Sequence, residues 1–428
     1  MRFPSYIHGV PLAALVASAL FNPMAMADNT IHLSGFGTLA INHSNRSGAD
    51  WTSTTEEYSG VGKTVLTSAG PDSDFGVQLD HQALPWLHET IQIVSRQLSN
   101  NTSTPYFEWA NIQIKMNPEW TMRLGRLANN TFLYSDSRDI GYDRPMIHLP
   151  DLYMLNPTAN INGGDLTYRT SLGNWTVHVN GNVGVFNQYY LNQTIGAHVR
   201  SSGFNIGAEY GNHAFRLSEA QGHIDLNNAK LNAYHVDLAI DSQAIAPFSQ
   251  TWSAQAQNAF QQTQLNEIPA SFMDASYTYD NGDQFVTMEW ARRQIGSDVD
   301  IPSQQGLYVQ AGQRTGRLTY YGQWGMTRTE TNAYITQIGG PTNNTLTMGL
   351  NGASASFSGS YNQSTTTAGL RWDIQNNLDL KIQDDYINKP AHSYGLFVGG
   401  GSTSGVPTVF FTQSRHINII SAALDFVF

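Results

Sequence analysis

The stretch QSRHINIISAALDFVF, residues 413–428, decides the fold of this chain. From His416 onward, one set of alternate positions carries Asn418, Ile420, Ala422, Leu424, Phe426 and Phe428, and the other ends in Ser421, Ala423 and Asp425. A repeat of two residues places successive side chains on opposite faces of a β-strand. The stretch therefore predicts a strand with one apolar and one wettable face, to which Ile417, Ile419 and Val427 are exceptions.

The same alternation recurs along the body of the chain. Its clearest instance is residues 175–185, where Trp175, Val177, Val179, Val183 and Val185 alternate with Thr176, His178, Asn180 and Asn182. Burying the second row in a soluble core would cost roughly 1–3 kcal/mol for each unpaired polar group. The pattern favours a closed sheet instead, with the apolar row in lipid and the polar row in a water-filled lumen.

Short turns and long loops separate these segments. Tight turns are predicted at 117–119, 172–174, 211–213, 281–283, 314–316 and 375–377, and long polar stretches lie near 43–72, 98–105, 128–161, 187–200, 222–268, 296–304, 328–363 and 390–412. We expect an all-β fold, a transmembrane antiparallel β-barrel of about sixteen strands with short periplasmic turns and long extracellular loops. About eighteen strands result if 344–361 or 229–239 hides another pair. Within 222–268, the Ala- and Gln-rich piece 245–262 is compatible with a surface helix.

The N-terminal residues differ from the rest. Residues 1–27 contain one basic residue, Arg2, an apolar run from Val10 to Phe21, and the small-x-small sequence Ala25-Met26-Ala27. This combination predicts a cleaved secretory signal peptide, whose apolar run is too short to span a bilayer. We therefore expect residues 28–428 to form a single barrel domain.

The composition excludes several function classes. The chain has no cysteine, which excludes thiolate metal sites and cysteine nucleophiles. Its net charge of −11 argues against nucleic-acid binding and favours cations mildly over anions. The 13 His residues show no metal-ligand spacing, and neither a nucleophile elbow nor a phosphate loop is present. We expect no metal, no cofactor and no enzymatic activity.

Residues 107–146, FEWANIQIKMNPEWTMRLGRLANNTFLYSDSRDIGYDRPM, resemble a family of proteobacterial outer-membrane porin-like proteins. In this family a strand, a Pro turn and a Gly-Arg strand lead into a Ser-Asp-x-Arg loop with Gly-Tyr. The stretches LSGFGTLAINHS at 33–44 and AALDFVF at 422–428 look similar too. Leu424, Phe426 and the final Phe428 also resemble the assembly signal of outer-membrane β-barrels. The resemblance implies a Gram-negative outer-membrane location, contact with phospholipid and lipopolysaccharide, a homotrimer, and passage of small hydrophilic solutes.

In such proteins the third long loop usually narrows the lumen, and here that loop is 128–161. It is rich in charged residues: Asp136, Arg138, Asp139, Asp143, Arg144 and Asp151. Carboxylates opposite guanidinium groups set up a transverse field in which polar solutes orient. Arg123, between Met122 and Leu124, is expected to face the lumen as well, because an Arg on the lipid face costs roughly 2–4 kcal/mol near the midplane. The alternative is a solvated surface loop with ordinary salt bridges.

Parity within the segments predicts further charges on the lumen wall. They are Arg96, Lys115, Glu289, Arg371, Lys381 and Asp385. As a group they indicate a hydrophilic channel. For any single one of them, a structural charge in the wall is the simpler interpretation than a role in selectivity.

Three functions are compatible with this sequence. The first is passive diffusion of small hydrophilic solutes and ions, with a weak cation preference. The second is a channel selective for a sugar, a dicarboxylate or an aromatic acid, in which Trp109, Tyr308 and Tyr321 offer rings for sugar stacking. The third is a barrel without channel function, such as an outer-membrane barrel enzyme, although no catalytic spacing is seen.

Overall fold

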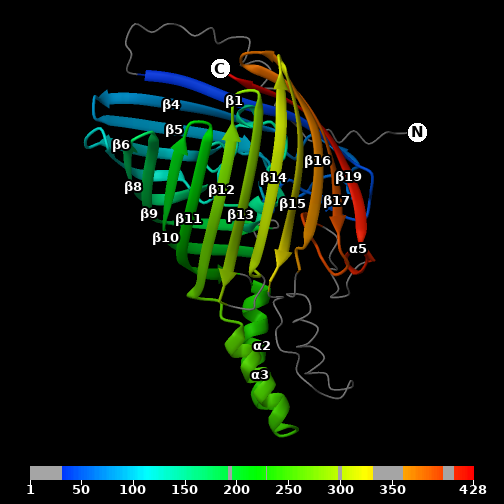
Figure 1. Ribbon diagram of the computed structural model, residues 1–428. Helices are drawn as coiled ribbons and strands as arrows, with labels where there is room; N and C mark the ends of the chain where they lie inside the picture. Colours follow the sequence, from blue (N-terminus) through cyan, green and yellow to red (C-terminus); the bar gives the residue numbers. More distant parts are fainter. Residues whose placement is uncertain (1–30, 191–194, 228, 297–300, 331–359, 399–408) are drawn as a thin grey trace.

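The computed structural model describes residues 31–190, 195–227, 229–296, 301–330, 360–398 and 409–428. Within these ranges, sixteen long antiparallel strands form one closed sheet (Figure 1). They are β1 (Ile31–Ser44), β4 (Asp74–Leu84), β5 (Leu87–Arg96), β6 (Tyr106–Lys115), β7 (Trp120–Ala128), β8 (Asn160–Leu172), β9 (Trp175–Tyr190), β10 (Ile195–Tyr210), β11 (His213–Asn227), β12 (Ile268–Asp280), β13 (Gln284–Ile295), β14 (Gln304–Thr315), β15 (Leu318–Thr329), β16 (Gln363–Gln375), β17 (Leu378–Lys389) and β19 (Arg415–Val427). The predicted barrel and its sixteen strands are confirmed.

The first and last long strands close the ring. β1 pairs with β4 along Ile31–Thr38 and with β19 along Phe36–Ser44. Beyond the last paired residue, Gly35 and Phe428 exchange two backbone hydrogen bonds of 2.9 Å. The rings of Phe428 and Phe426 lie against Gly35 and Gly37, where a Cβ atom would meet them at 2.2 and 2.6 Å. Small residues in β1 thus make room for the terminal aromatic rings.

The two faces of the strands follow the predicted alternation. In β9, Val183 is 63% exposed on the outer face, whereas Asn180 on the inner face is 3% exposed. In β19, the exceptions Ile417 and Ile419 are both fully buried, in one cluster with Trp51 and Phe410. Their inward position is explained by apolar loop residues that cover this end of the lumen, not by lipid.

The connections alternate in length as expected, with three differences. Pro85-Trp86 forms a further tight turn, between β4 and β5. β9 extends to Tyr190 and β10 begins at Ile195, so the predicted loop at 187–200 is shorter, and its flanking residues belong to the strands. Residues 229–239 are helical, so they hide no strand pair; of the other alternative, 344–361, nearly all residues lie outside the described ranges.

Helices and short strands lie at the end of the barrel that carries the long loops. α2 (Ala229–Ile245) and α3 (Gln250–Gln262) form a hairpin that extends beyond the strand ends, opposite the C-terminus (Figure 1). The predicted helix at 245–262 lies within this hairpin. The helical region begins earlier, at Ala229, and is interrupted between Ile245 and Gln250. β2 (Asp50–Trp51) pairs with β18 (Phe397–Val398), β3 (Thr67–Ser68) pairs with β1, and α5 spans Val409–Thr412. Among the described residues, none of the helices is long and apolar enough to cross a membrane.

Candidate functional site

The connection between β7 and β8, residues 129–159, lies against the inner faces of strands far from its own ends. We call it the inserted segment. It contains two short 3-10 helices, η1 (Gly141–Asp143) and η2 (Asp151–Leu155). The apolar residues of η2 are buried in one cluster with Ala291 of β13 and Tyr308 of β14. Apolar burial and a series of polar contacts hold the segment to the wall.

The first polar contact is made by Glu289 of β13. Its carboxylate accepts hydrogen bonds from the backbone N–H of Leu133 at 2.6 Å and from the hydroxyl of Tyr153 at 3.1 Å. The Tyr153 oxygen also accepts from the N–H of Tyr134 at 2.9 Å. A carboxylate that accepts from a backbone N–H forms one of the stronger hydrogen bonds in proteins. Glu289 therefore fixes the beginning of the inserted segment.

Arg216 of β11 holds the same end of the segment from the neighbouring wall. Its guanidinium donates to the carbonyl oxygens of Asn130 at 2.6 Å and Thr131 at 3.2 Å. It also pairs with Asp274 of β12 at 2.9 Å. Arg216 thus connects two strands to the backbone of the segment.

Lys381 of β17 holds the middle of the segment. Its ammonium group donates to the carbonyl oxygen of Gly141 at 2.7 Å and pairs with Asp425 of β19 at 2.8 Å. Asp425 also accepts from the hydroxyl of Thr38 at 2.6 Å. A Cβ atom on Gly141 would come within 2.2 Å of Asp425 Oδ1, so this close approach requires glycine.

Arg371 of β16 contacts the next residues of the segment. It donates to the carbonyl oxygens of Tyr142 at 2.7 Å and Arg144 at 3.2 Å. Its guanidinium lies 4.6 Å from the ring centroid of Tyr142, within cation–π range. On the wall side it pairs with Asp379 at 3.1 Å.

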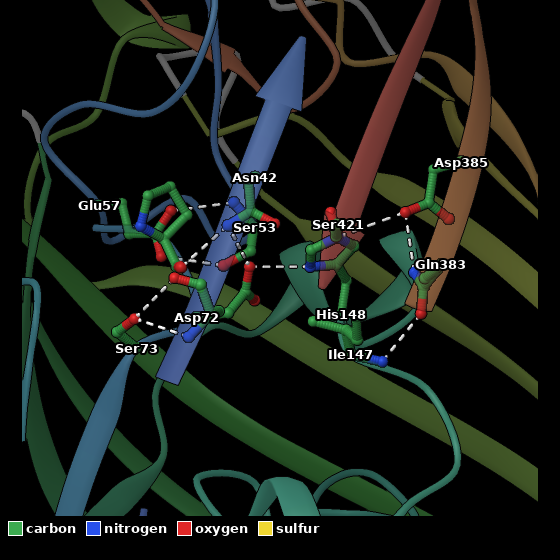
Figure 2. A network of polar contacts seen from close by, with 12 residues as sticks. Asn42, Ser53, Glu57, Asp72, Ser73, Ile147, His148, Gln383, Asp385 and Ser421 are labelled. Carbon is green, nitrogen blue, oxygen red and sulfur yellow. Dashed lines mark hydrogen bonds and ion pairs between the residues drawn. The ribbon is translucent and has the colours of Figure 1, made fainter. Parts of the chain in front are cut away.

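His148 is the centre of the polar network drawn in Figure 2. Its Nδ1 lies 2.8 Å from Asp72, and its Nε2 lies 2.9 Å from the hydroxyl of Ser421 and 3.4 Å from Asp385. Burial lowers the pKa of His148, but the neighbouring carboxylates of Asp72 and Asp385 outweigh burial and raise it above its ordinary value. His148 thus joins the segment to the loop before β4 through Asp72 and to the wall through Ser421 and Asp385.

Gln383 and Asp385 of β17 complete this network. Gln383 Oε1 accepts from the backbone N–H of Ile147 at 2.8 Å and from the hydroxyl of Tyr321 at 2.7 Å. Its amide nitrogen donates to Asp385 at 2.8 Å, and Asp385 also accepts from Thr367 at 2.5 Å. Gln383 thus joins Ile147 of the segment to Tyr321 and Asp385 of the wall.

The carboxyl group of Glu57 is buried close to Asp72, and both residues lie in the connection between β1 and β4. Glu57 accepts hydrogen bonds of 2.9 Å from the backbone N–H and from the hydroxyl of Ser53 (Figure 2). Burial, together with the negative charge of Asp72, raises the pKa of Glu57 to about 7. This group therefore changes its charge near neutral pH.

The opposite side of the inserted segment keeps charged groups in contact with solvent. Asp136 and Asp143 are exposed. Asp139 lies 3.6 Å from Arg96 of β5, which joins the segment to the wall on this side as well. Arg123 of β7 faces inward and pairs with Asp165 of β8 at 2.5 Å. Carboxylates of the segment and guanidinium groups of the wall thus face the same part of the lumen.

Three of the predicted constriction residues are turned away from the open lumen, Arg138 and Arg144 into the segment and Asp151 toward the wall. Arg144 is buried and donates to the carbonyl oxygens of Ser137, Arg138 and Ile147, at 3.4, 2.8 and 3.4 Å. Asp151 is buried and accepts from Thr365 at 2.6 Å, and burial raises its pKa to about 6. Arg138 donates to the carbonyl oxygen of Asn156 at 3.3 Å. Arg138 and Arg144 stabilise the backbone of the segment, because its carbonyl groups need donors away from water. Asp151 instead joins the segment to β16.

The predicted wall charges fall into two groups. Five of them contact the inserted segment directly: Arg96, Glu289, Arg371, Lys381 and Asp385. Lys115 is exposed near the tight turn after β6, away from these contacts. Tyr308 and Tyr321 face inward but are buried beneath the segment, so they offer no stacking surface to a solute. Trp109 lines a small cavity beside Asp136 and Glu108.

Sequence reasoning missed Arg216, Gln383, Asp72 and the central role of His148. The parity of Arg216 and Gln383 in their strands places both side chains inward, and this signal was available. Nothing in the local sequence of Asp72 or His148 indicates their contact, since they lie in two loops without periodicity. Among the described residues, no group of three or more His, Asp or Glu side chains is placed to hold a metal ion.

Comparisons with known proteins identify the fold. No family model matches the sequence, and no curated protein matches it. Among solved structures, an anion-selective porin from Comamonas acidovorans matches with a TM-score of 0.52 and 11% identity, covering 93% of this chain and 99% of that one. The outer-membrane channel DcaP of Acinetobacter baumannii matches at 0.51 and 10%, covering 93% and 97%. OmpT, an outer-membrane protein of Vibrio cholerae, matches in a trimer form at 0.50 and 9%, covering 94% and 100%.

The class that the architecture defines is the closed, sixteen-stranded antiparallel β-barrel. Within that class, this chain has the fold of the bacterial outer-membrane porins. At these identities the likeness concerns the fold alone.

Proposed function

We propose that this protein is an outer-membrane porin, a passive diffusion channel for small hydrophilic solutes and ions. The inserted segment carries the proposal. Its contacts with Glu289, Arg371 and Lys381 hold it against one side of the lumen, while Asp136, on its other side, stays in contact with solvent. A segment fixed in this way narrows the passage to a charged region, and such a region selects solutes by size and charge.

We assign the constriction to Asp136, Asp139 and Asp143 of the segment and to Arg96 and Arg123 of the wall. Arg138 and Arg144 support the backbone that presents these groups, and Asp151 joins that backbone to β16 through Thr365. Flow down a concentration gradient needs no cofactor and no catalytic residue. The proposal therefore includes no enzymatic step.

Planar-bilayer recording of the purified, folded protein tests this function. We expect discrete conductance steps in KCl and, in a salt gradient, a reversal potential with weak cation preference, because the chain carries a net charge of −11. Anion selectivity is stated for the Comamonas protein, and we do not transfer it to this chain. The absence of conductance steps would refute the channel. A strongly anion-selective reversal potential would show that the lumen arginines outweigh the acidic balance.

Location and assembly belong to the same proposal. We infer export by a cleaved signal peptide, residues 1–27, which lie outside the described residues, followed by insertion among phospholipid and lipopolysaccharide as a homotrimer. The trimer form of the OmpT structure supports the last point. Cell fractionation, N-terminal sequencing of the mature protein, and native mass spectrometry test the three parts separately.

A substrate-selective channel is the second candidate, and one observation favours it. An apolar hollow lies beside the inserted segment, on the side of β9–β13. A pore for hydrophilic solutes alone has no need for such a surface.

A further inference from the structure

The polarity of the barrel wall is reversed in one region, near the ends of β9–β12 that carry the long loops. Phe186, Val199, Ile224 and Ile268 lie directly opposite one another across these four strands, and all four are buried on the inner side. On β10 the outward neighbours His198 and Arg200 are polar and exposed, whereas the outward neighbour Val185 on β9 is apolar. Apolar side chains also face inward elsewhere, as Ile417 and Ile419 do, but here they form one row across four adjacent strands.

The next row of inward residues lies beside the apolar row, and the two rows together line a cavity. It consists of Gly184, Ser201, Gly222 and Ala270, again directly opposite one another. Because these side chains are small, they leave a hollow between the strands and the inserted segment. The hollow measures about 80 Å³, and Leu155 of the segment lines it from the other side. This volume is several times what a single buried water needs.

A polar group in this hollow is unsatisfied. Gln188 of β9 is 5% exposed and lines the hollow, and its amide nitrogen has no hydrogen-bond partner among the described residues. Its amide oxygen is occupied, because it accepts from the hydroxyl of Thr158 at 2.9 Å. A buried donor without a partner costs roughly 1–3 kcal/mol. An oxygen atom of a bound molecule would satisfy it.

We propose that this hollow binds small amphipathic solutes that have a compact apolar group and an acceptor oxygen, such as aromatic or branched aliphatic carboxylic acids. The apolar group lies against the row of Val199 and Ile224, and the oxygen accepts from Gln188. The inference rests on the proposed channel and adds a selectivity site to it, beside the charged constriction. The size of the hollow restricts it to small molecules.

Benzoate and acetate are the matched probes, since both carry a carboxylate and benzoate alone carries a ring. We expect benzoate to reduce the KCl conductance saturably, and acetate at the same concentrations to leave it unchanged. Ligand-observed NMR on the folded protein in detergent measures the binding without any need for conductance. Conductance steps without benzoate binding would overturn this inference and leave the channel intact. Benzoate binding without conductance steps would overturn the channel and leave the site intact.

Three variants locate the site. Ser201→Leu fills the hollow and should weaken benzoate binding at least about tenfold. Gln188→Met removes the donor at nearly constant volume and should weaken it about fivefold, as expected for one hydrogen bond. Ser202→Leu, the adjacent residue on the outer face of β10, is the matched control and should leave binding unchanged. The far-UV circular dichroism spectrum of each variant in detergent verifies its fold. Equal benzoate affinity of Ser201→Leu and Ser202→Leu would refute the site.

Discussion

The two sides of the lumen are built differently although the strands that form them alternate in the same way. On the side of β12–β19, the inserted segment covers the wall, and Asp274, Gln310 and Lys381 are inaccessible to solvent. On the side of β6–β10, the inward side chains of Lys115, Arg169 and Glu209 are exposed. The strands determine which side chains point inward, but the inserted segment determines which of these are buried. A lumen charge is therefore structural or solvated according to where residues 129–159 lie.

This comparison predicts that equal substitutions have unequal effects on the two sides. On the covered side Glu289, Arg371 and Lys381 have fixed partners, and removing one of these side chains leaves another group buried without compensation. At the exposed positions on the open side, Lys115, Arg169 and Glu209, water replaces whatever is removed.

The largest effect is expected for Lys381→Met. The substitution leaves Asp425 buried without its cation, and removing one partner of a buried ion pair costs about 3–5 kcal/mol. Denaturant unfolding of the refolded protein, followed by tryptophan fluorescence, measures the loss. Lys115→Met on the open side is the matched control and should remain within about 0.5 kcal/mol of wild type. Similar losses in both variants would contradict the comparison.

A pH-dependent loss of stability is expected from Glu57. Its pKa is about 7 in the folded protein against an ordinary value of 4.5, so the folded state binds the proton more tightly than the unfolded state. The stabilisation is complete below pH 4.5 and is lost as the pH rises through 7. The total is on the order of 3 kcal/mol, because each pKa unit corresponds to about 1.4 kcal/mol.

Glu57→Gln, which mimics the protonated form, should flatten the stability curve over this interval. Thermal unfolding at a series of pH values measures it. Glu119→Gln, in the exposed turn after β6, should retain the wild-type slope. An unchanged slope in Glu57→Gln would assign the pH dependence to another group.

A smaller effect is expected for Gly141→Ala. The added methyl group would meet Asp425 Oδ1 and Thr38 Oγ1 at 2.2 and 2.4 Å, so the segment must move away from the wall. Overpacking of this kind costs about 1–3 kcal/mol. Thermal unfolding measures the cost, and the conductance should change as well if the segment narrows the lumen. Gly181→Ala, where no atom lies within 4 Å of the new methyl group, is the control.

The smallest effect on stability is expected for Asp136→Asn. Its side chain is exposed on the open side, so stability should stay within about 0.5 kcal/mol of wild type. The reversal potential in a salt gradient should shift toward lower cation preference, because a carboxylate is lost from the proposed constriction. Asp283→Asn, in the exposed turn between β12 and β13, should leave both quantities unchanged. An unaltered reversal potential in Asp136→Asn would remove this residue from the constriction.

The barrel was predictable from the sequence because its strands and tight turns follow from patterns among neighbouring residues. Alternation with a period of two identified the strands, and most turns were marked by Gly, Asn or Pro. Parity also placed Lys381, Asp385 and Glu289 inward. Arg126 of β7, with the opposite parity, lies on the outer face close to the strand end, where it donates to Asn162 at 3.5 Å. Its height near the rim explains why the charge is tolerated there.

The interior arrangement was not predictable in the same way. The inserted segment has no periodicity, and its partners lie far away in the sequence, as with His148 and Ser421. The density of charge in the loop led us to place Arg144 and Asp151 in the constriction together with Asp136. In the structure Arg144 and Asp151 are buried, whereas Asp136 is exposed. What decides between them is which backbone carbonyl and hydroxyl groups lie nearby, and this depends on the tertiary fold.

The seam between β1 and β19 has a consequence for how the molecule forms. Thr38 and Asp425, which meet there, are 387 residues apart in the chain. Contacts of such long range are slow to form, and until they form both strands remain open edges able to pair with another molecule. The two edges are therefore protected from pairing with another molecule only once this seam has closed.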